Sequence, residues 1–261
     1  MKIQFIGTGS GKTSLKRNHS SILIDTLDSK LLIDCGDGIS KALLKSEIMF
    51  NSIDSILFTH YHADHFSGIS SLITQMKLNE RKNELKIFTH KNLVEPLKDF
   101  LHTCYLFEDK LEFEIQFFGY DFDQEYKVDN KLSFTTKQNI HISNKYQVTS
   151  IPQNRFVSAS ILLKSEKKEI IYTSDIEKKE DLFLFDKFEP TIYITETTHI
   201  ELEWLSEVVN FYRPKQIFLT HISDEDEEKI VKFLNNQTFS HISKIDIVED
   251  GQYVTLSRDF T

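Results

Sequence analysis

The sequence has 261 residues, and 31 Lys and Arg against 40 Asp and Glu give it a formal net charge of −9 at pH 7. A content of 39% hydrophobic and 27% charged residues is typical of a folded globular protein and excludes disordered and collagen-like chains. The acidic balance is opposite to that of most nucleic-acid-binding proteins, although it leaves room for a local basic groove.

Short apolar runs and helical patterns alternate along the chain. Strands are predicted at residues 2–6, 21–25, 31–34, 55–59, 86–89, 161–164, 170–173, 191–195, 216–220 and 245–248. Helices are predicted to begin near Gly38 and Ser67 and to cover 202–211 and 224–234. Residues 101–131 show no clear pattern. Because strands and helices interleave without a linker rich in Pro, Gly or Ser, we expect one α/β domain over residues 1–261.

Targeting and redox features point to the cytoplasm. The apolar run at residues 1–6 stops at Gly7, which is too short for a signal-peptide core, and no stretch of eighteen apolar residues occurs. Cys35 and Cys104 cannot make a disulfide framework, and we expect both to be buried thiols. The sequence thus predicts a cytoplasmic protein with no membrane segment.

A dense group of histidines follows the apolar strand predicted at residues 55–59. His60 and His62 are two residues apart, so in an extended chain their side chains point the same way and can converge on one metal ion. Asp64 and His65 follow where the chain turns toward a helix, and they offer ligands for a second ion. Imidazole and carboxylate donors suit zinc, and they also accept manganese or iron.

This group resembles the HxHxDH signature of the metallo-β-lactamase superfamily. The family places further ligands at strand ends later in the chain, and the candidates for them are His141, Asp175 and His221. Asp34 matches the family aspartate that supports the metal loop from behind. The resemblance covers nearly the whole chain and implies a four-layer αβ/βα sandwich of the metallo-β-lactamase type.

The resemblance also implies two divalent metal ions, with zinc favoured. One ion would be bound by His60, His62 and His141. The other would be bound by Asp64, His65 and His221. Asp175 would bridge the two together with a water or hydroxide that acts as the nucleophile, and Asp64 would orient this nucleophile and carry its proton. Such a site keeps about one positive charge, which favours an anionic ester.

The glycine-rich segment at residues 7–11 indicates the branch of the superfamily. It resembles a phosphate-binding P-loop, but Ile6 stands where that motif requires glycine. Together with residues 17–21 and 34–38, it resembles instead the ribonuclease Z and phosphodiesterase branch. In that branch the first loop lies beside the metals, so His19 is a candidate for substrate contact. The equally weighted alternative is that His19 is a loop residue without a functional role.

Two features depart from ribonuclease Z. Where that enzyme has an HExT-type loop, residues 195–198 read Thr-Glu-Thr-Thr, so Glu196 is kept and the histidine before it is lost. His199, which follows Glu196 in the sequence, is a candidate to replace that histidine. A Gly/Pro-rich arm that would hold transfer RNA is missing, since residues 101–131 contain one Gly and no Pro. With the net charge of −9, this makes a small phosphodiester, such as a cyclic nucleotide or short oligonucleotide, as good a candidate substrate as RNA.

The sequence therefore predicts a dinuclear metal-dependent hydrolase that acts on a small phosphodiester or on RNA. One alternative is a hydrolase of carboxylic esters, thioesters or lactones that uses the same metals. Another is a non-catalytic binding protein on this scaffold, because a fold does not determine a function. The resemblance further implies a homodimer.

Overall fold

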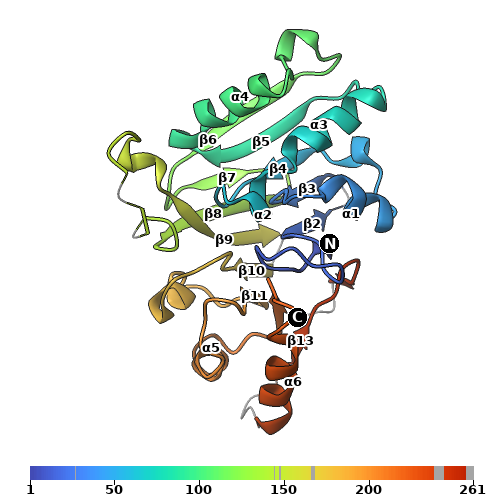
Figure 1. Ribbon diagram of the computed structural model, residues 1–261. Coiled ribbons are helices and arrows are strands. Elements are labelled where there is room, and N and C mark those ends of the chain that lie inside the picture. The colour runs from blue at the N-terminus through green and yellow to red at the C-terminus, as the bar shows by residue number, and fades with distance from the viewer. Residues whose placement is uncertain (27, 144, 147, 166–167, 238–243, 257–261) are drawn as a thin grey trace. The chain divides into compact units, whose positions relative to one another are not determined.

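The computed structural model describes residues 1–26, 28–143, 145–146, 148–165, 168–237 and 244–256 (Figure 1). The chain divides into two compact units, each built on a seven-stranded sheet. Unit 1 comprises Met1–Asp121, Val128–Asn130 and the described residues from Glu249 onward. Unit 2 comprises Phe122–Lys127 and the described residues of Lys131–Val248.

The sheet of unit 1 has the strand order β14-β1-β2-β3-β4-β5-β6. Its strands are β1 (Lys2–Gly7), β2 (Ser21–Asp25), β3 (Lys30–Ile33), β4 (Ser55–Leu57), β5 (Leu85–His90), β6 (Ile115–Tyr120) and β14 (Tyr253–Thr255). Strands β14 to β3 pair antiparallel, whereas β3 to β6 pair parallel. Its helices are α1 (Ile39–Lys45), α2 (Ala63–Phe66), α3 (Ile69–Leu78) and α4 (Val94–Thr103), with short 3-10 turns at Phe50–Ser52, Lys91–Leu93 and Glu108–Lys110.

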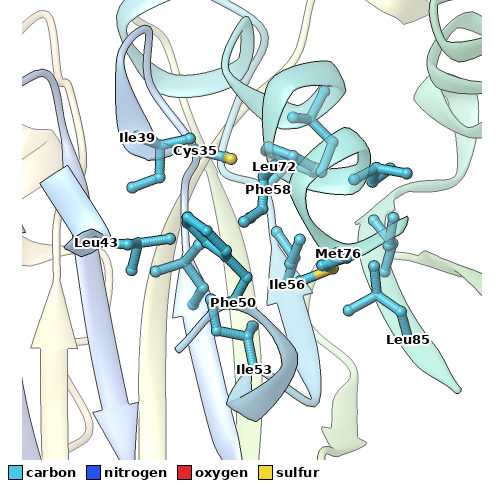
Figure 2. Close-up of a cluster of buried hydrophobic side chains, with 14 of the residues drawn as sticks. Cys35, Ile39, Leu43, Phe50, Ile53, Ile56, Phe58, Leu72, Met76 and Leu85 are labelled. Atoms are coloured by element: carbon cyan, nitrogen blue, oxygen red, sulfur yellow. The ribbon is translucent and has the colours of Figure 1, made fainter. Parts of the chain in front are cut away.

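One apolar cluster joins α1, α3 and α4 to this sheet. Figure 2 shows Leu43 of α1 and Leu72 and Met76 of α3 gathered around Ile56 of β4 and Phe58. These five side chains are fully buried. Burying an aliphatic side chain of this size contributes about 1.5–3 kcal/mol. The cluster therefore anchors the end of β4, where the predicted metal ligands begin.

The sheet of unit 2 has the strand order β13-β12-β11-β10-β9-β8-β7. Its strands are β7 (Glu125–Lys127), β8 (Leu132–Asn139), β9 (Ser158–Ser165), β10 (Lys168–Tyr172), β11 (Ile192–Glu196), β12 (Gln216–Thr220) and β13 (Lys244–Ile247). Strands β7 to β10 pair antiparallel and β10 to β13 parallel. Its helices are α5 (Trp204–Tyr212) and α6 (Glu227–Asn236), with 3-10 turns at Gln153–Arg155 and Lys179–Phe183.

Helix α5 provides most of the helical contribution to the core of unit 2. Leu205, Val208 and Val209 are buried and belong to one cluster with Tyr193 of β11 and Ile217 of β12. This packing follows from the apolar face of α5, whose members are spaced three and four residues apart. It positions the carboxyl ends of β11 and β12.

The α/β class is confirmed, since each unit combines a mixed sheet with helices. The strand predicted at 216–220 coincides with β12, whereas α5 begins two residues later than predicted. The prediction for Cys104 is wrong, because this thiol follows α4 and is exposed, while Cys35 is buried. That the two units form one domain stays a prediction. In the described part of the chain, no helix combines the length and apolar character needed to cross a membrane.

Candidate functional site

The predicted site residues follow strands that run in one direction within each sheet. In unit 1, Asp34 follows β3 and residues 60–65, here called the metal loop, follow β4. In unit 2, four polar residues lie at or just after the ends of β8, β10, β11 and β12, namely His141, Asp175, Glu196 and His221. The carboxyl edge of such a sheet is where polar groups of α/β proteins commonly gather.

The metal loop brings three imidazoles and a carboxylate together inside unit 1. The main-chain nitrogens of His65 and Phe66 both donate to His62 O at 2.9 Å, which starts the short helix α2. His60 and His65 are fully buried, and their rings lie 4.2 Å apart between centroids. The His62 ring is 4.8 Å from that of His60, and Asp64 Oδ2 is 3.6 Å from His65 Nε2.

Asp34 supports this loop through a buried hydrogen-bond network. Its Oδ1 accepts from Thr59 N at 2.8 Å, and its Oδ2 accepts from Thr59 Oγ1 at 2.8 Å and lies 2.7 Å from His65 Nδ1. Thr59 Oγ1 also lies 3.0 Å from His60 Nδ1. Both imidazoles are therefore engaged at Nδ1, which leaves their Nε2 atoms for a metal, as is usual for metal-binding histidines. Burial raises the pKa of Asp34 against the lowering effect of His65 and Thr59.

Glycine at position 36 allows the two loops of this half-site to approach closely. A Cβ there would lie 2.1 Å from Asp64 O and 2.7 Å from His19 Cβ. Cys35 N, next to it, donates to His65 O at 2.6 Å. A side chain at Gly36 would therefore separate the metal loop from the segment that carries Asp34.

In unit 2, Asp175 lies between two buried imidazoles. Its Oδ2 is 3.5 Å from His141 Nε2, and its Oδ1 is 3.4 Å from His221 Nε2. These separations exceed an ordinary hydrogen bond, and each carboxylate oxygen faces a different histidine. Exposures of 1% for His141 and 2% for Asp175 and His221 make this a desolvated cluster. Its donor set, two imidazoles on opposite oxygens of one carboxylate, fits a carboxylate that bridges two metal ions.

The backbone at the strand ends is held in uncommon conformations. Asp34, Ser174 and His221 have φ values of 60°, 54° and 53°. Non-glycine residues in this left-handed region cost about 1–3 kcal/mol each and occur mainly where surrounding contacts impose them, often at functional sites. The three positions directly carry or precede predicted site residues.

Glu196, at the end of β11, organises the loops around Asp175. Its Oε1 accepts from Ile176 N at 2.8 Å, and its Oε2 accepts from the main-chain nitrogens of Thr198 at 3.0 Å and His199 at 2.8 Å. His199 Nδ1 lies 2.9 Å from both carboxylate oxygens. Glu196, His199 and His221 offer ligand atoms within 4.8 Å of one another. Because Glu196 is engaged by three amides, it is better explained as the residue that holds His199 in place.

Burial and charge act in opposite directions on His199. Burial lowers its pKa, but the hydrogen bond and negative charge of Glu196, together with the charge of Asp175, outweigh burial and raise the pKa above its ordinary value. Its ring lies 4.9 Å from that of His141 and 5.9 Å from that of His221, between centroids. With 30% of its side chain exposed, His199 is accessible to a ligand.

His19 lies in unit 1 beside Gly36. Its ring nitrogens are covered, and neither has a hydrogen-bond partner among the residues that the structure describes. A covered imidazole without a partner is costly, and such groups call for a specific explanation. His19 thus stays a candidate for ligand contact.

Some supporting residues are absent from the sequence-based prediction. Thr59 links Asp34 to His60, and its place directly before the first motif histidine was the available signal. Thr198 donates through Oγ1 to His221 O at 2.6 Å. Lys145 lies 3.3 Å from His141 Nδ1 and pairs with Glu177 at 2.7 Å. No sequence pattern marks Thr198 or Lys145 as a supporting residue.

Comparison with known proteins assigns the family. Residues 1–247 match the family model described as anti-Pycsar protein Apyc1. The chain belongs to this family. The Apyc1 protein of Bacillus phage vB_BveM-Goe7 is 28% identical over 251 residues, which cover 88% of this chain and 92% of the phage protein.

Beyond the Apyc1 family, the chain is similar to ribonuclease Z. The enzyme from Archaeoglobus fulgidus is 38% identical over 88 residues, which cover 34% of this chain but only 29% of that enzyme. Matches to ribonucleases Z from two Thermoplasma species likewise span less than half of those proteins. The structure of the metallo-β-lactamase fold protein YhfI from Bacillus subtilis has a TM-score of 0.74 at 18% identity and covers 97% of this chain and 98% of that one. The predicted metallo-β-lactamase fold and the predicted resemblance to ribonuclease Z are both confirmed.

Proposed function

We propose that this Apyc1-family chain is a dinuclear metal-dependent hydrolase of phosphodiesters. The observation that carries the proposal is Asp175, whose two oxygens face His141 and His221 within a desolvated cluster. Following the superfamily motif, the ligands of the first ion are His60, His62 and His141. The ligands of the second are Asp64, His65 and His221. Zinc is the favoured metal, with manganese and iron as alternatives.

Two such ions would polarise the ester and lower the pKa of a water molecule for attack. The chain's own groups provide orientation and charge. Asp64 is buried, with 8% of its surface exposed, and we assign to its carboxylate the task of orienting the attacking water and accepting its proton. The negative charges of Asp64 and Asp175 do not fully offset the positive charges of two divalent ions. The remaining positive charge favours an anionic substrate.

His199 is suited to protonate the leaving oxygen of the ester. A protonated imidazole that is partly exposed and fixed at Nδ1 by Glu196 presents Nε2 as the donor. This assigns to His199 the task of the histidine that is missing before Glu196. Glu196 and its partner histidine are then still in contact, although the histidine follows the glutamate in the sequence and does not precede it.

In Glu196→Gln, we expect the pKa of His199 to fall, because the amide cannot replace the negative charge while burial still disfavours the imidazolium. A raised folded-state pKa means that the pair's contribution to stability is complete below about pH 6.5 and is lost as pH rises through the raised value. The variant should lack this pH dependence. NMR titration of metal-free protein, with the resonance assigned by His199→Gln, measures the pKa, and an equal pKa in both proteins would contradict the role of Glu196.

For the substrate, a small phosphodiester, such as a cyclic nucleotide or short oligonucleotide, is as good a candidate as RNA. The net charge of −9 and the lack of a Gly/Pro-rich arm in residues 101–131 weigh against transfer RNA in particular. A homodimer and a cytoplasmic location, as implied by the sequence, remain predictions.

A substrate panel tests the proposal. Cyclic nucleotides, linear dinucleotides, a precursor transfer RNA, a lactone and a thioester are each incubated with the protein and zinc or manganese. We expect cleavage of the small phosphodiesters and its loss with a chelator. Turnover of the lactone or thioester alone would establish acyl-ester hydrolysis instead, and turnover of none, with metal bound, would favour a binding protein.

A further inference from the structure

The glycine-rich segment at residues 8–18, here called loop 8–18, is closed at its base. Gly9 N donates to Asn18 O at 2.8 Å, and Gly9 forms an isolated parallel bridge with His19. Between these ends the chain makes an excursion whose tip, at Gly11, Lys12 and Thr13, is exposed. The loop is therefore a small ring of main chain attached to unit 1.

One carboxylate clamps both ends of this ring. Asp250 Oδ1 accepts from Thr8 N at 2.9 Å and from Thr8 Oγ1 at 2.8 Å, while Oδ2 accepts from Asn18 N at 2.6 Å. Thr8 Oγ1 in turn accepts from the buried guanidinium of Arg17 at 2.6 Å. Hydrogen bonds to a charged carboxylate are about twice as strong as neutral ones, so three of them hold the loop firmly.

Asp250 is itself fixed by the sheet of unit 1. Gly251 N donates to Phe5 O at 2.7 Å, and Phe5 N donates to Gln252 O at 2.9 Å. These bonds attach the turn that carries Asp250 to β1, next to the pairing of β1 with β14. The clamp thus connects loop 8–18 to the rigid part of the unit.

The tip of the loop rests on the carboxylate of Asp64. A Cβ at Gly11 would lie 3.2 Å from Asp64 Oδ2 and 3.4 Å from Asp64 Cγ. The main chain at Gly11 therefore passes close enough to this carboxylate that one added methyl group would touch it. An outward movement of the loop would change the surroundings of Asp64 on this side.

We propose that Asp250 is a positioning residue for the hydrolysis: it keeps loop 8–18 closed, and the closed loop fixes the carboxylate of Asp64. The inference rests on the proposed function, in which Asp64 binds a metal ion and orients the attacking water. Asp250 acts only through the loop, so it influences the geometry at Asp64 and not the supply of ligands. A role in stability alone would leave that geometry unchanged.

Two variants perturb the contact from different ends. Asp250→Ala opens the base of the loop, and Gly11→Ala adds a methyl group against Asp64. Asp54→Ala is the matched control, because Asp54 Oδ2 also accepts a main-chain N–H in unit 1, from Lys30 at 2.9 Å, and has no bond to loop 8–18. Asp250→Asn keeps part of the clamp and serves as the conservative variant.

The readouts are the visible absorption spectrum of the cobalt-substituted protein and the steady-state constants with zinc on the best phosphodiester. We expect Asp250→Ala and Gly11→Ala to change the cobalt spectrum and to lower kcat by about 10–100-fold, the range for residues that orient metal ligands. Asp250→Asn should recover part of both. Asp54→Ala should keep the wild-type spectrum and kcat.

An unchanged spectrum and kcat in Asp250→Ala, or an equal loss in Asp54→Ala, would overturn the positioning role. If Asp250→Ala does not fold, Asp250→Asn and Gly11→Ala decide by the same readouts. If the variants change the cobalt spectrum but the wild-type protein cleaves no phosphodiester, the proposed function is rejected. The influence of the Asp250 clamp on the geometry at Asp64 is then still supported. A wild-type protein that binds no cobalt would overturn both.

Discussion

Asp175→Asn is expected to lower kcat for phosphodiester hydrolysis by about three orders of magnitude. Asparagine has the size of aspartate, but it carries no charge and presents an NH2 group to one of the two imidazoles that now face carboxylate oxygens. A bridging carboxylate helps to hold both ions, whose stabilisation of transition-state charge is worth several kcal/mol, and each 1.36 kcal/mol corresponds to about tenfold in rate. Steady-state kinetics and metal content of the purified variant measure the effect.

A matched control for this substitution exists in the same unit. Asp181 is 3% exposed and accepts from the main-chain nitrogens of Glu177 at 3.2 Å and Lys178 at 3.4 Å, without lying between imidazoles. Asp181 also accepts from the main chain of Ile140, beside His141, so Asp181→Asn should lower stability and reduce kcat far less than Asp175→Asn does. If Asp175→Asn kept its metals and more than a tenth of its activity, the bridging role of Asp175 would be excluded.

Asp34→Ala is expected to weaken metal binding and stability together. The substitution leaves His65 Nδ1 and the amide and hydroxyl of Thr59 without their buried acceptor. Removing a partner that orients a metal-binding histidine typically costs 10–100-fold in metal affinity or activity. Leaving a buried hydrogen-bond donor without its acceptor typically costs about 1–3 kcal/mol of unfolding free energy per group.

Urea denaturation of the metal-free protein and competition with a chromogenic chelator separate these two effects. Thr59→Val, which removes only the hydroxyl, should show smaller changes in both measurements. Metal affinity that stays at the wild-type value in folded Asp34→Ala would show that Asp34 does not support the metal loop.

The residues of the metal loop stand out from the sequence alone, because they are contiguous and follow an apolar strand. His141, Asp175 and His221 follow only from the resemblance to the metallo-β-lactamase superfamily, and the metal-binding role of all these residues stays a prediction. The end of β4 was placed two residues too late. Phe58 N still donates to Phe88 O of β5, but Thr59 N donates to the side chain of Asp34, so the regular pairing of the strand ends before Thr59.

Contacts between distant segments could not be predicted in this way. Asp250 meets Thr8 across 242 positions, and no periodicity connects an acidic residue in a late turn with a glycine-rich loop. Residues 101–131 contain β6 and β7, and β6 combines a glycine with partly exposed aromatic residues, so neither strand nor helix periodicity stands out. The network of Glu196 likewise depends on main-chain amides, which the sequence does not reveal.

The metal content of the wild-type protein tests the central claim most directly. The protein is purified without chelators and without metal-affinity chromatography, and it is dialysed against metal-free buffer. Its metal content is then measured by inductively coupled plasma mass spectrometry. The proposed function predicts about two divalent ions per chain, mainly zinc, manganese or iron, and fewer in Asp175→Asn. A folded wild-type protein that carries no such ion, and takes none up when zinc or manganese is added, would contradict it.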